Sequence, residues 1–254
     1  MASGLGKPHG HLFAPLGFCA KLEIDTGRKG HEPVQDPSDS AMRGPRAKAK
    51  RKACARPKAA PSKSDVTRAR ILDAAATEFR DQGYAGARLA DIAARIGMKA
   101  GSLYYHFESR EALVEAVMER GISRTQAALE QRLAALPAGT DHLTRLEAAI
   151  ETHLVLLLEQ GDSASASIKL IWQVPGDVRE RAVERQRAYG ELWRRLLADA
   201  RKAGAIRADV DLSIVRMAIL GALNWALDWY KPQRGSPKRI ARDISAMILN
   251  GLAK

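Results

Sequence analysis

The sequence predicts an all-α protein of about nine helices, and three observations support this fold class. After residue 64, apolar residues recur at helical spacing in segment after segment, and no segment alternates apolar and polar residues as a half-buried strand does. Glycine and proline separate these segments, for example at 137–139, 175–176 and 235–237. The 254-residue chain is long enough to bury a substantial core, in one large domain or two smaller ones.

The first quarter of the chain has a different composition. Residues 1–64 contain 13 Lys and Arg but only 5 Asp and Glu, are rich in Gly, Pro and Ser, and show no period, so we predict a disordered basic arm. Within it, residues 42–58 carry eight basic residues and no acidic one. This stretch is either a solubilising tail or a flexible arm that contacts DNA phosphates or enters a minor groove.

Several classes of protein are disfavoured. The two cysteines, Cys19 and Cys54, form no CxxC pair, and the chain starts without a secretory signal. The longest apolar run, 217–230, contains Asp228 and is shorter than the ~20 residues of a membrane span. No motif of a hydrolase, metalloprotease or dinucleotide enzyme is present. We therefore expect a cytoplasmic, nucleoid-associated protein that is not an enzyme and has no cofactor, no metal site and no membrane partner.

Four helices are predicted between residues 65 and 121. The first carries an apolar stripe and ends at a glycine cap, Gly83; the stripe consists of Val66, Ile71, Ala74, Ala75, Phe79 and Tyr84. Two short helices follow at 89–96 and 100–106. The fourth begins near Ser109 and continues to about residue 135. The later helices are predicted at 140–160, 163–174, 177–203, 210–230 and 237–252, the last with Ser236 as N-cap and Pro237 in its first turn.

The segment GMKAGSLYYHF at 97–107 predicts the second helix of a helix-turn-helix, which enters the major groove of DNA by its N-terminal part. Ala100 and Gly101 would let the backbone approach the bases, and Lys99 and Ser102 would reach base edges or phosphates. Further candidate DNA contacts are Arg88, Tyr104, Tyr105, His106 and Arg110. Leu103 and Phe107 are expected to point into the core, and a core position is also favoured for Tyr105 over a DNA contact.

The stretch ARLADIAARIGMKAGSLYYHFESREALVEAV resembles the N-terminal DNA-binding domain of the TetR family of transcriptional regulators. The resemblance implies a DNA-binding domain at 65–121, with its motif at about 88–107, followed by an effector-binding and dimerisation domain at 122–254. In that family, a set of matching positions commonly faces DNA, and the resemblance implies the same role here for Lys99, Ala100, Ser102, Tyr104, His106 and Arg110. This chain has Ala87 and Arg88 where the family usually has a capping Thr or Ser, and Lys99 where it often has Ser.

The last two predicted helices mix small and large apolar residues, which allows close helix packing and a symmetric contact between two subunits. The expected interface residues of this homodimer are Gly221, Ala222, Trp225, Ile244 and Ile248. The alternative is that these helices only close the core of one chain.

The ending ALNWALDWYKP resembles a subgroup of TetR-like regulators that respond to acyl-CoA thioesters. The effector site is unknown from the sequence; Trp172 and Trp193 are candidates for its apolar wall. A set of arginines could meet phosphates or simply form a solvated helix face: Arg179, Arg181, Arg185, Arg187, Arg194 and Arg195.

We therefore expect a ligand-responsive DNA-binding repressor. It would bind a pseudo-palindromic operator as a dimer and be released by a small molecule, an acyl-CoA thioester in the subgroup that it resembles. The alternative is a structural protein that binds nucleic acid through its basic arm without regard to sequence.

Overall fold

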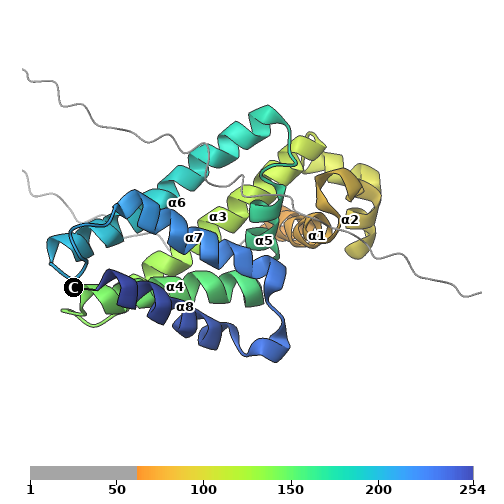
Figure 1. Ribbon diagram of the computed structural model, residues 1–254. Helices are drawn as coiled ribbons and strands as arrows, with labels where there is room; N and C mark the ends of the chain where they lie inside the picture. Colours follow the sequence, from red (N-terminus) through yellow and green to blue (C-terminus); the bar gives the residue numbers. More distant parts are fainter. Residues whose placement is uncertain (1–61, 254) are drawn as a thin grey trace, which may run out of the picture. The chain divides into compact units, whose positions relative to one another are not determined.

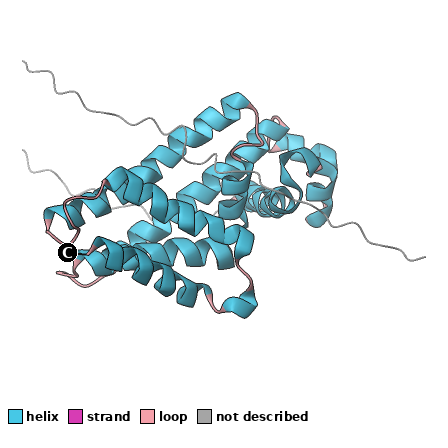
Figure 2. Cartoon of the chain, viewed as in Figure 1, coloured by secondary structure: helices cyan, strands magenta, loops and turns pink. Residues whose placement is uncertain are grey.

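A computed structural model describes residues 62–253, which form a helical unit (Figures 1 and 2). The all-α prediction is confirmed: within these residues no strand is present, and the single β-bridge joins Ile206 to Ala253. Nearly all of the predicted arm at 1–64, with both cysteines, lies outside the described residues. None of the described helices is long and apolar enough to cross a membrane.

Eight α-helices make up most of this unit. They are α1 (Lys63–Gly86), α2 (Leu89–Arg95), α3 (Arg110–Ala134), α4 (His142–Val155), α5 (Asp162–Leu170), α6 (Gly176–Lys202), α7 (Leu212–Trp229) and α8 (Pro237–Leu252). A 3-10 helix, η1 (Ala100–Tyr105), lies between α2 and α3, and a second, η3 (Pro232–Arg234), lies between α7 and α8. A π-helix, η2 (Leu156–Gln160), follows α4 directly.

Side-chain caps fix where the helices begin. Ser62 and Asp65 form a reciprocal capping box at the start of α1. Ser109, Asp141 and Ser236 each accept a hydrogen bond from a backbone N–H in the first turn of α3, α4 and α8. The predicted starts at Ser109 and at Ser236–Pro237 are thus confirmed.

Three predicted elements differ from the structure. The chain leaves the helical conformation at Gly83, at φ +69°, as predicted for a glycine cap, but a short further helical stretch follows as far as Gly86. Gln173 Oε1 accepts a hydrogen bond from the Tyr84 N–H at 2.9 Å just after this kink. The predicted helix 140–160 changes to a π-helix after Val155. Val66 is 48 % exposed, since the first turns of α1 lie beyond the helices that cover Ile71 and Phe79.

Two hydrophobic clusters lie at different ends of the unit. The first joins α1, α2, η1, the start of α3, α5 and the start of α6, with Phe79 and Leu113 at its centre. The second joins the end of α3 with α4, α6, α7 and α8 around Trp193. Helix α3 runs continuously through residue 121, where the sequence suggested a domain boundary, and contributes to both clusters (Figure 1).

Candidate nucleic-acid interface

Helix α2 and η1 are joined by a tight turn at Gly97. Gly97 adopts φ +70°, a conformation that glycine takes without steric cost. The Met98 N–H donates to the Ala93 carbonyl at 2.9 Å and closes the turn. Half-exposed Arg95 forms an ion pair at 3.0 Å with Glu78, a buried carboxylate of α1. The turn is therefore held to α1 by both packing and charge.

The two faces of η1 differ sharply in burial. Leu103 and Phe107 are 2 % and 5 % exposed and pack into the first cluster, as predicted. Tyr104 is 56 % and Tyr105 is 88 % exposed. The favoured core position of Tyr105 is therefore wrong: its ring packs edge-on against His106, at 5.5 Å between centroids, and not into the cluster. An exposed tyrosine pair next to a half-buried histidine is available to a ligand.

The N-terminal end of η1 is open. A Cβ added to Gly101 would meet nothing within 4 Å, and Lys99, Gly101 and Ser102 are all exposed. The Ser102 N–H donates to the Lys99 carbonyl at 2.9 Å, which starts the 3-10 turn. With half-buried Ala100 between them, these residues form a narrow, uncrowded edge.

Arg88 lies at the start of α2 as its N-cap residue, exposed and without a side-chain cap bond. This agrees with the departure from the family pattern at this position. Among the described residues, neither Arg88 nor Lys99 forms an ion pair of 4.0 Å or less. Within the described part of the chain, both positive charges are therefore available for a phosphate or a base.

Arg110 is placed differently from what the sequence suggested. Its guanidinium lies over the Tyr84 ring, 4.6 Å from the centroid, and donates a hydrogen bond to the Tyr84 carbonyl. Tyr84 in turn donates to Glu111 at 2.9 Å, and burial, followed by this bond, raises the pKa of the Tyr84 phenol. Because Arg110 is used to fasten α3 to the end of α1, the geometry argues against a DNA contact by this residue.

Five of the nine acidic residues of the DNA-binding part form ion pairs. Residues 65–121 contain eight Lys and Arg and nine Asp and Glu, a nearly neutral balance. However, Glu115 pairs with Arg181 at 2.9 Å and Asp73 pairs with Arg120 at 2.8 Å. The remaining pairs of this kind are Glu78 with Arg95, Asp81 with Arg80, and Glu119 with Arg185. Within the motif, Arg88 and Lys99 are exposed cations, and Asp91 is an exposed acid.

Two arginines of α1 were missed by the sequence analysis. The Arg68 guanidinium lies 4.5 Å from the centroid of the Phe107 ring, and the Arg70 Nη2 donates to the Ile96 carbonyl at 3.1 Å. Both arginines are exposed; Arg68 lies against a residue just after η1, and Arg70 lies against the turn that precedes η1. These arginines lie 26 and 39 residues before their partners in the sequence, so no local spacing connects them; only the packing of α1 brings them together.

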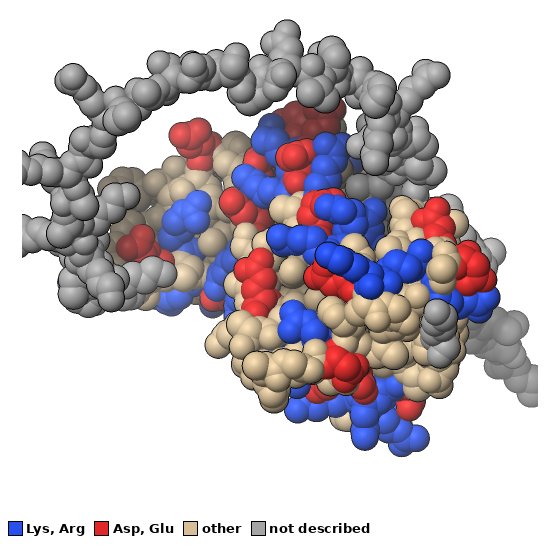
Figure 3. All heavy atoms as spheres, turned by 90° about the vertical axis from the view of Figure 1, so that its left-hand side faces the viewer, with Lys and Arg blue, Asp and Glu red and all other residues tan. Residues whose placement is uncertain are grey.

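The far end of the molecule carries side chains of both charges. On the face turned to the viewer in Figure 3, which is the left-hand side of Figure 1, basic and acidic side chains are interspersed around uncharged areas. An electrostatic site for a polyanion is therefore not evident on that face.

An apolar stripe lies on the outer face of α7. Ile214 and Trp225 are 68 % and 60 % exposed, and Ala222 lies between them on the same side. Met247 on α8 is 78 % exposed. Of the other expected interface residues, Gly221 is half-buried, and Ile244 and Ile248 are half-buried against the second cluster of their own chain. Ile214 was missed, although it lies three helical turns before Trp225.

The two tryptophans suggested for the effector site differ in burial. Trp172 is 46 % exposed beneath the Arg179 guanidinium, whereas Trp193 is fully buried in the second cluster. Most of the arginines suggested for phosphate binding are occupied. Arg179 donates to backbone carbonyls, Arg181 and Arg185 pair with Glu115, Arg187 with Glu184, and Arg194 with Glu191.

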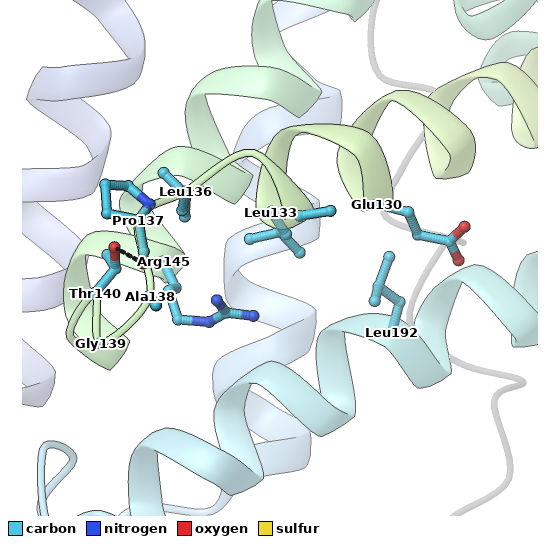
Figure 4. A pocket seen from close by; sticks show the side chains of 10 residues that line it. Glu130, Leu133, Leu136, Pro137, Ala138, Gly139, Thr140, Arg145 and Leu192 are labelled. Atoms are coloured by element: carbon cyan, nitrogen blue, oxygen red, sulfur yellow. Dashed lines mark hydrogen bonds between the residues drawn. The ribbon is translucent and has the colours of Figure 1, made fainter.

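A pocket of about 490 Å³ lies at the end of α3 and the loop that leads into α4 (Figure 4). Leu133 of α3 and Leu192 of α6 line it from facing helices, and Arg145 and Glu130 supply its charges. The Thr140 hydroxyl donates to the Pro137 carbonyl at 2.7 Å and closes the loop. The pocket lies against the part of α6 that carries Trp193.

A supported helix-turn-helix with an open recognition edge, joined to a helical domain with an exposed apolar face, defines a DNA-binding regulator. Comparison with known proteins gives the family. Residues 71–117 match the bacterial regulatory proteins of the tetR family, and residues 139–252 match the tetracyclin repressor-like C-terminal domain. The chain belongs to the TetR family of transcriptional regulators.

Its relatives are regulators as well. The chain is 28 % identical to the HTH-type transcriptional repressor KstR2 of Rhodococcus jostii, over 73 % of this chain and 91 % of that protein. It is 28 % identical to KstR2 of Mycolicibacterium smegmatis, over 76 % and 94 %. Among solved structures, AibR in complex with isovaleryl coenzyme A and operator DNA matches with a TM-score of 0.64 and 25 % identity, over 71 % of this chain and 96 % of that one.

Proposed function

We propose that this protein is a repressor that binds a pseudo-palindromic operator as a homodimer and leaves it when a small molecule, of the acyl-CoA thioester class, binds the C-terminal domain. The observation that carries the DNA-binding part is the open edge of η1, where Lys99, Gly101 and Ser102 are exposed and unobstructed. Family membership supports this function over a structural protein that ignores sequence. A location in the cytoplasm follows from binding DNA.

The DNA contacts are divided by chemistry. Lys99 and Ser102 carry the polar groups nearest the open edge and are assigned to base edges. Arg88, Tyr104, Tyr105 and His106 are assigned to phosphates, since cations, hydroxyls and ring N–H groups are the usual phosphate donors. The exposed arginines that flank the motif, Arg68 and Arg70, are added to this second group.

The exposed stripe on α7 supports the homodimer. A contiguous apolar face is the surface that a subunit contact covers, and the same patch on two copies makes a closed symmetric pair. Two recognition edges in such a pair fit half-sites about one helical turn of DNA apart, or a multiple of it.

The contacts of α5 provide a route between ligand and DNA. Asp162, at the start of α5, accepts a hydrogen bond from Thr77 at 2.7 Å and pairs with Arg80, both on α1. On the other side, a Cβ on Gly121 of α3 would collide with Ser163 and Ser167 of α5. Because α5 is bound to α1 and packed tightly against α3, a shift of α5 on ligand binding would also move α1 and the recognition edge.

The acyl-CoA class is supported by one solved structure of a similar protein and by one sequence resemblance. The AibR structure contains isovaleryl coenzyme A with operator DNA, and the resemblance of residues 222–232 to acyl-CoA-responsive regulators points the same way. Because effector and DNA would favour different conformations, each must weaken the binding of the other by the same factor.

The test begins with DNA fragments retained by the purified full-length protein from a sheared genomic library. A shared pseudo-palindrome in the retained fragments is the expected result. The labelled operator is then titrated with acyl-CoAs of different chain length. Retention of random fragments would overturn the repressor proposal, and an operator complex that no thioester releases would remove the acyl-CoA class alone.

A further inference from the structure

A polar cluster is buried in the otherwise apolar core of the C-terminal domain. His153 of α4 is 5 % exposed; its Nδ1 lies 2.7 Å from the Tyr189 hydroxyl of α6, and its Nε2 lies 3.1 Å from Asn224 Oδ1 of α7. The His153 ring stacks on Tyr189, and Trp193 packs edge-on against both rings. Burying a polar group lowers the stability of the fold unless the group is hydrogen-bonded, so a buried polar cluster indicates a specific role.

The direction of its hydrogen bonds follows from the groups present. An amide oxygen only accepts, so His153 Nε2 carries the proton and donates to Asn224. Burial lowers the pKa of His153 to about 4, so the ring is neutral near pH 7 and Nδ1 is an acceptor. Tyr189 therefore donates its proton to Nδ1.

Two N–H donors at this cluster have no acceptor in the described part of the chain, one on Trp193 and one on Asn224. The Trp193 Nε1 is fully buried and has no hydrogen-bond partner among the described residues. Burial raises the pKa of the Tyr189 phenol, and the nearby Trp193 N–H partly offsets this rise. The two groups nevertheless do not form a hydrogen bond. The amide nitrogen of half-buried Asn224 is a second donor beside the cluster, since the Asn224 oxygen is the atom that binds His153; unlike the Trp193 Nε1, it is not a fully buried atom. A buried, unpaired N–H is a feature that a ligand acceptor would satisfy.

The cluster contains no fully buried cation that would favour a charged acceptor. Within residues 62–253, the only buried Asp, Glu, Lys or Arg is Glu78, which belongs to the other cluster. A carboxylate brought beside Trp193 would therefore lose its hydration without a fully buried Lys or Arg to pair with. A carbonyl oxygen needs only the N–H donors that are present.

The backbone beside the cluster is irregular. Helix α4 changes into the π-helix η2 two residues after Leu154, and a Cβ on Gly161 at its end would lie 2.5 Å from the Leu156 carbonyl oxygen. π-helical turns are often found at functional sites, because the wider turn displaces side chains from the regular register. Asp162, which binds α1, follows directly. The cluster is thus connected to the proposed route toward the recognition edge.

We propose that the Trp193 and Asn224 N–H groups form the polar end of the effector site and bind an uncharged carbonyl oxygen, such as that of a thioester or ketone, whose apolar chain is buried among the leucines and isoleucines of the same core. This inference rests on the proposed function and deepens it: it selects thioesters and ketones over free fatty acids. It requires the site to open, since Trp193 and His153 are closed off from solvent in this structure.

The test uses two probes that differ at one group. S-octanoyl-N-acetylcysteamine has a thioester carbonyl, and S-octyl-N-acetylcysteamine, a thioether, lacks it; octanoate supplies a charged acceptor. Binding to the full-length protein is measured by calorimetry. We expect the thioester to bind roughly two- to tenfold more tightly than the thioether, the range for one hydrogen bond, and octanoate to bind more weakly than the thioester.

Trp193→Phe should abolish the preference for the thioester over the thioether, and Asn224→Leu, at a half-buried position, should reduce it. Trp172→Phe, at an exposed tryptophan, is the matched control and should keep the preference. Equal binding of thioester and thioether to the wild type, no binding of any probe, or an unchanged preference in Trp193→Phe would overturn the inference. Operator binding by the same samples without probe shows separately whether the proposed regulator function stands.

Discussion

The guanidinium of Arg110 lies 4.6 Å above the centre of the Tyr84 ring and donates to the carbonyl of the same residue. This contact ties the first turn of α3 to the end of α1 and is half-buried. Arg110 therefore helps to position η1. The exposed positive charges of the motif include those of Arg88 and Lys99.

Two single alanine variants should distinguish the structural role of Arg110 from the DNA-binding role proposed for Arg88. Arg110→Ala should lower the free energy of unfolding by about 1–2 kcal/mol, because it removes a cation–π contact and a charged hydrogen bond. Arg88→Ala should leave stability within about 0.5 kcal/mol and lower the salt slope of DNA binding by about one. Urea unfolding and operator titrations at several salt concentrations measure both. A changed salt slope in Arg110→Ala with normal stability would reverse the assignment.

Gly101 tests the open edge of η1. A Cβ there meets no protein atom within 4 Å, so Gly101→Ala should fold with unchanged or slightly higher stability. In the major groove the same methyl group would stand between the backbone and the bases, so operator affinity should fall at least tenfold. Gly176→Ala, at a second open glycine in α6 far along the chain, should leave operator affinity unchanged. Wild-type affinity in Gly101→Ala would place the groove contact elsewhere.

The ion pair between Arg95 and buried Glu78 should matter more than pairs on the surface. Arg95→Ala leaves a buried carboxylate without its partner and should lower the free energy of unfolding by about 1–3 kcal/mol, a range reduced for the half-exposed position of the arginine. Arg194→Ala, which breaks an exposed pair with Glu191 within one helix, is the control and should cost less than about 0.5 kcal/mol. Equal losses in thermal or urea unfolding would show that burial of Glu78 contributes nothing.

Trp225 tests the apolar stripe. Trp225→Glu places a charge on the apolar stripe that is proposed as the subunit contact and should convert the dimer to a monomer in sedimentation velocity. Trp172→Glu makes the same change at an exposed tryptophan outside the stripe and should leave the dimer intact. A wild-type protein that is monomeric at micromolar concentration, or a Trp225→Glu dimer, would place the contact on another face.

Stability should depend on His153 in mildly acidic solution. Its pKa is about 4 in the folded chain, because burial disfavours the charged ring, against 6.5 in the unfolded chain. The unfolded state therefore binds more protons between these values, and stability is lost as the pH falls from 6.5 towards 4. Between pH 7 and pH 5 the loss should be about 2 kcal/mol. His153→Gln should lose less free energy of unfolding than the wild type over this pH range. The carboxylates present in both proteins contribute equally, so the difference between the two curves reports His153. Parallel curves of unfolding free energy against pH would contradict the assignment.

Local sequence signals predicted much of this molecule. Helical periodicity predicted most of the helices, Ser109 and Ser236 predicted two of their starts, and Gly97 predicted the turn before the recognition segment. These features depend on residues within one or two turns of each other, as do the inward positions of Leu103 and Phe107. The composition of 97–107 pointed to a helix-turn-helix for the same reason.

Long-range partners required the tertiary structure. Arg110 bound to Tyr84, Arg68 over Phe107, and His153 between Tyr189 and Asn224 join residues 26 to 71 positions apart, and no spacing rule connects them. The sequence by itself determined which segments are helical and which segment resembles a DNA reader. Only the packing of those helices decided which charges are paired, which polar groups are buried without a partner, and which apolar face is left uncovered, because these properties depend on what each side chain meets across the fold.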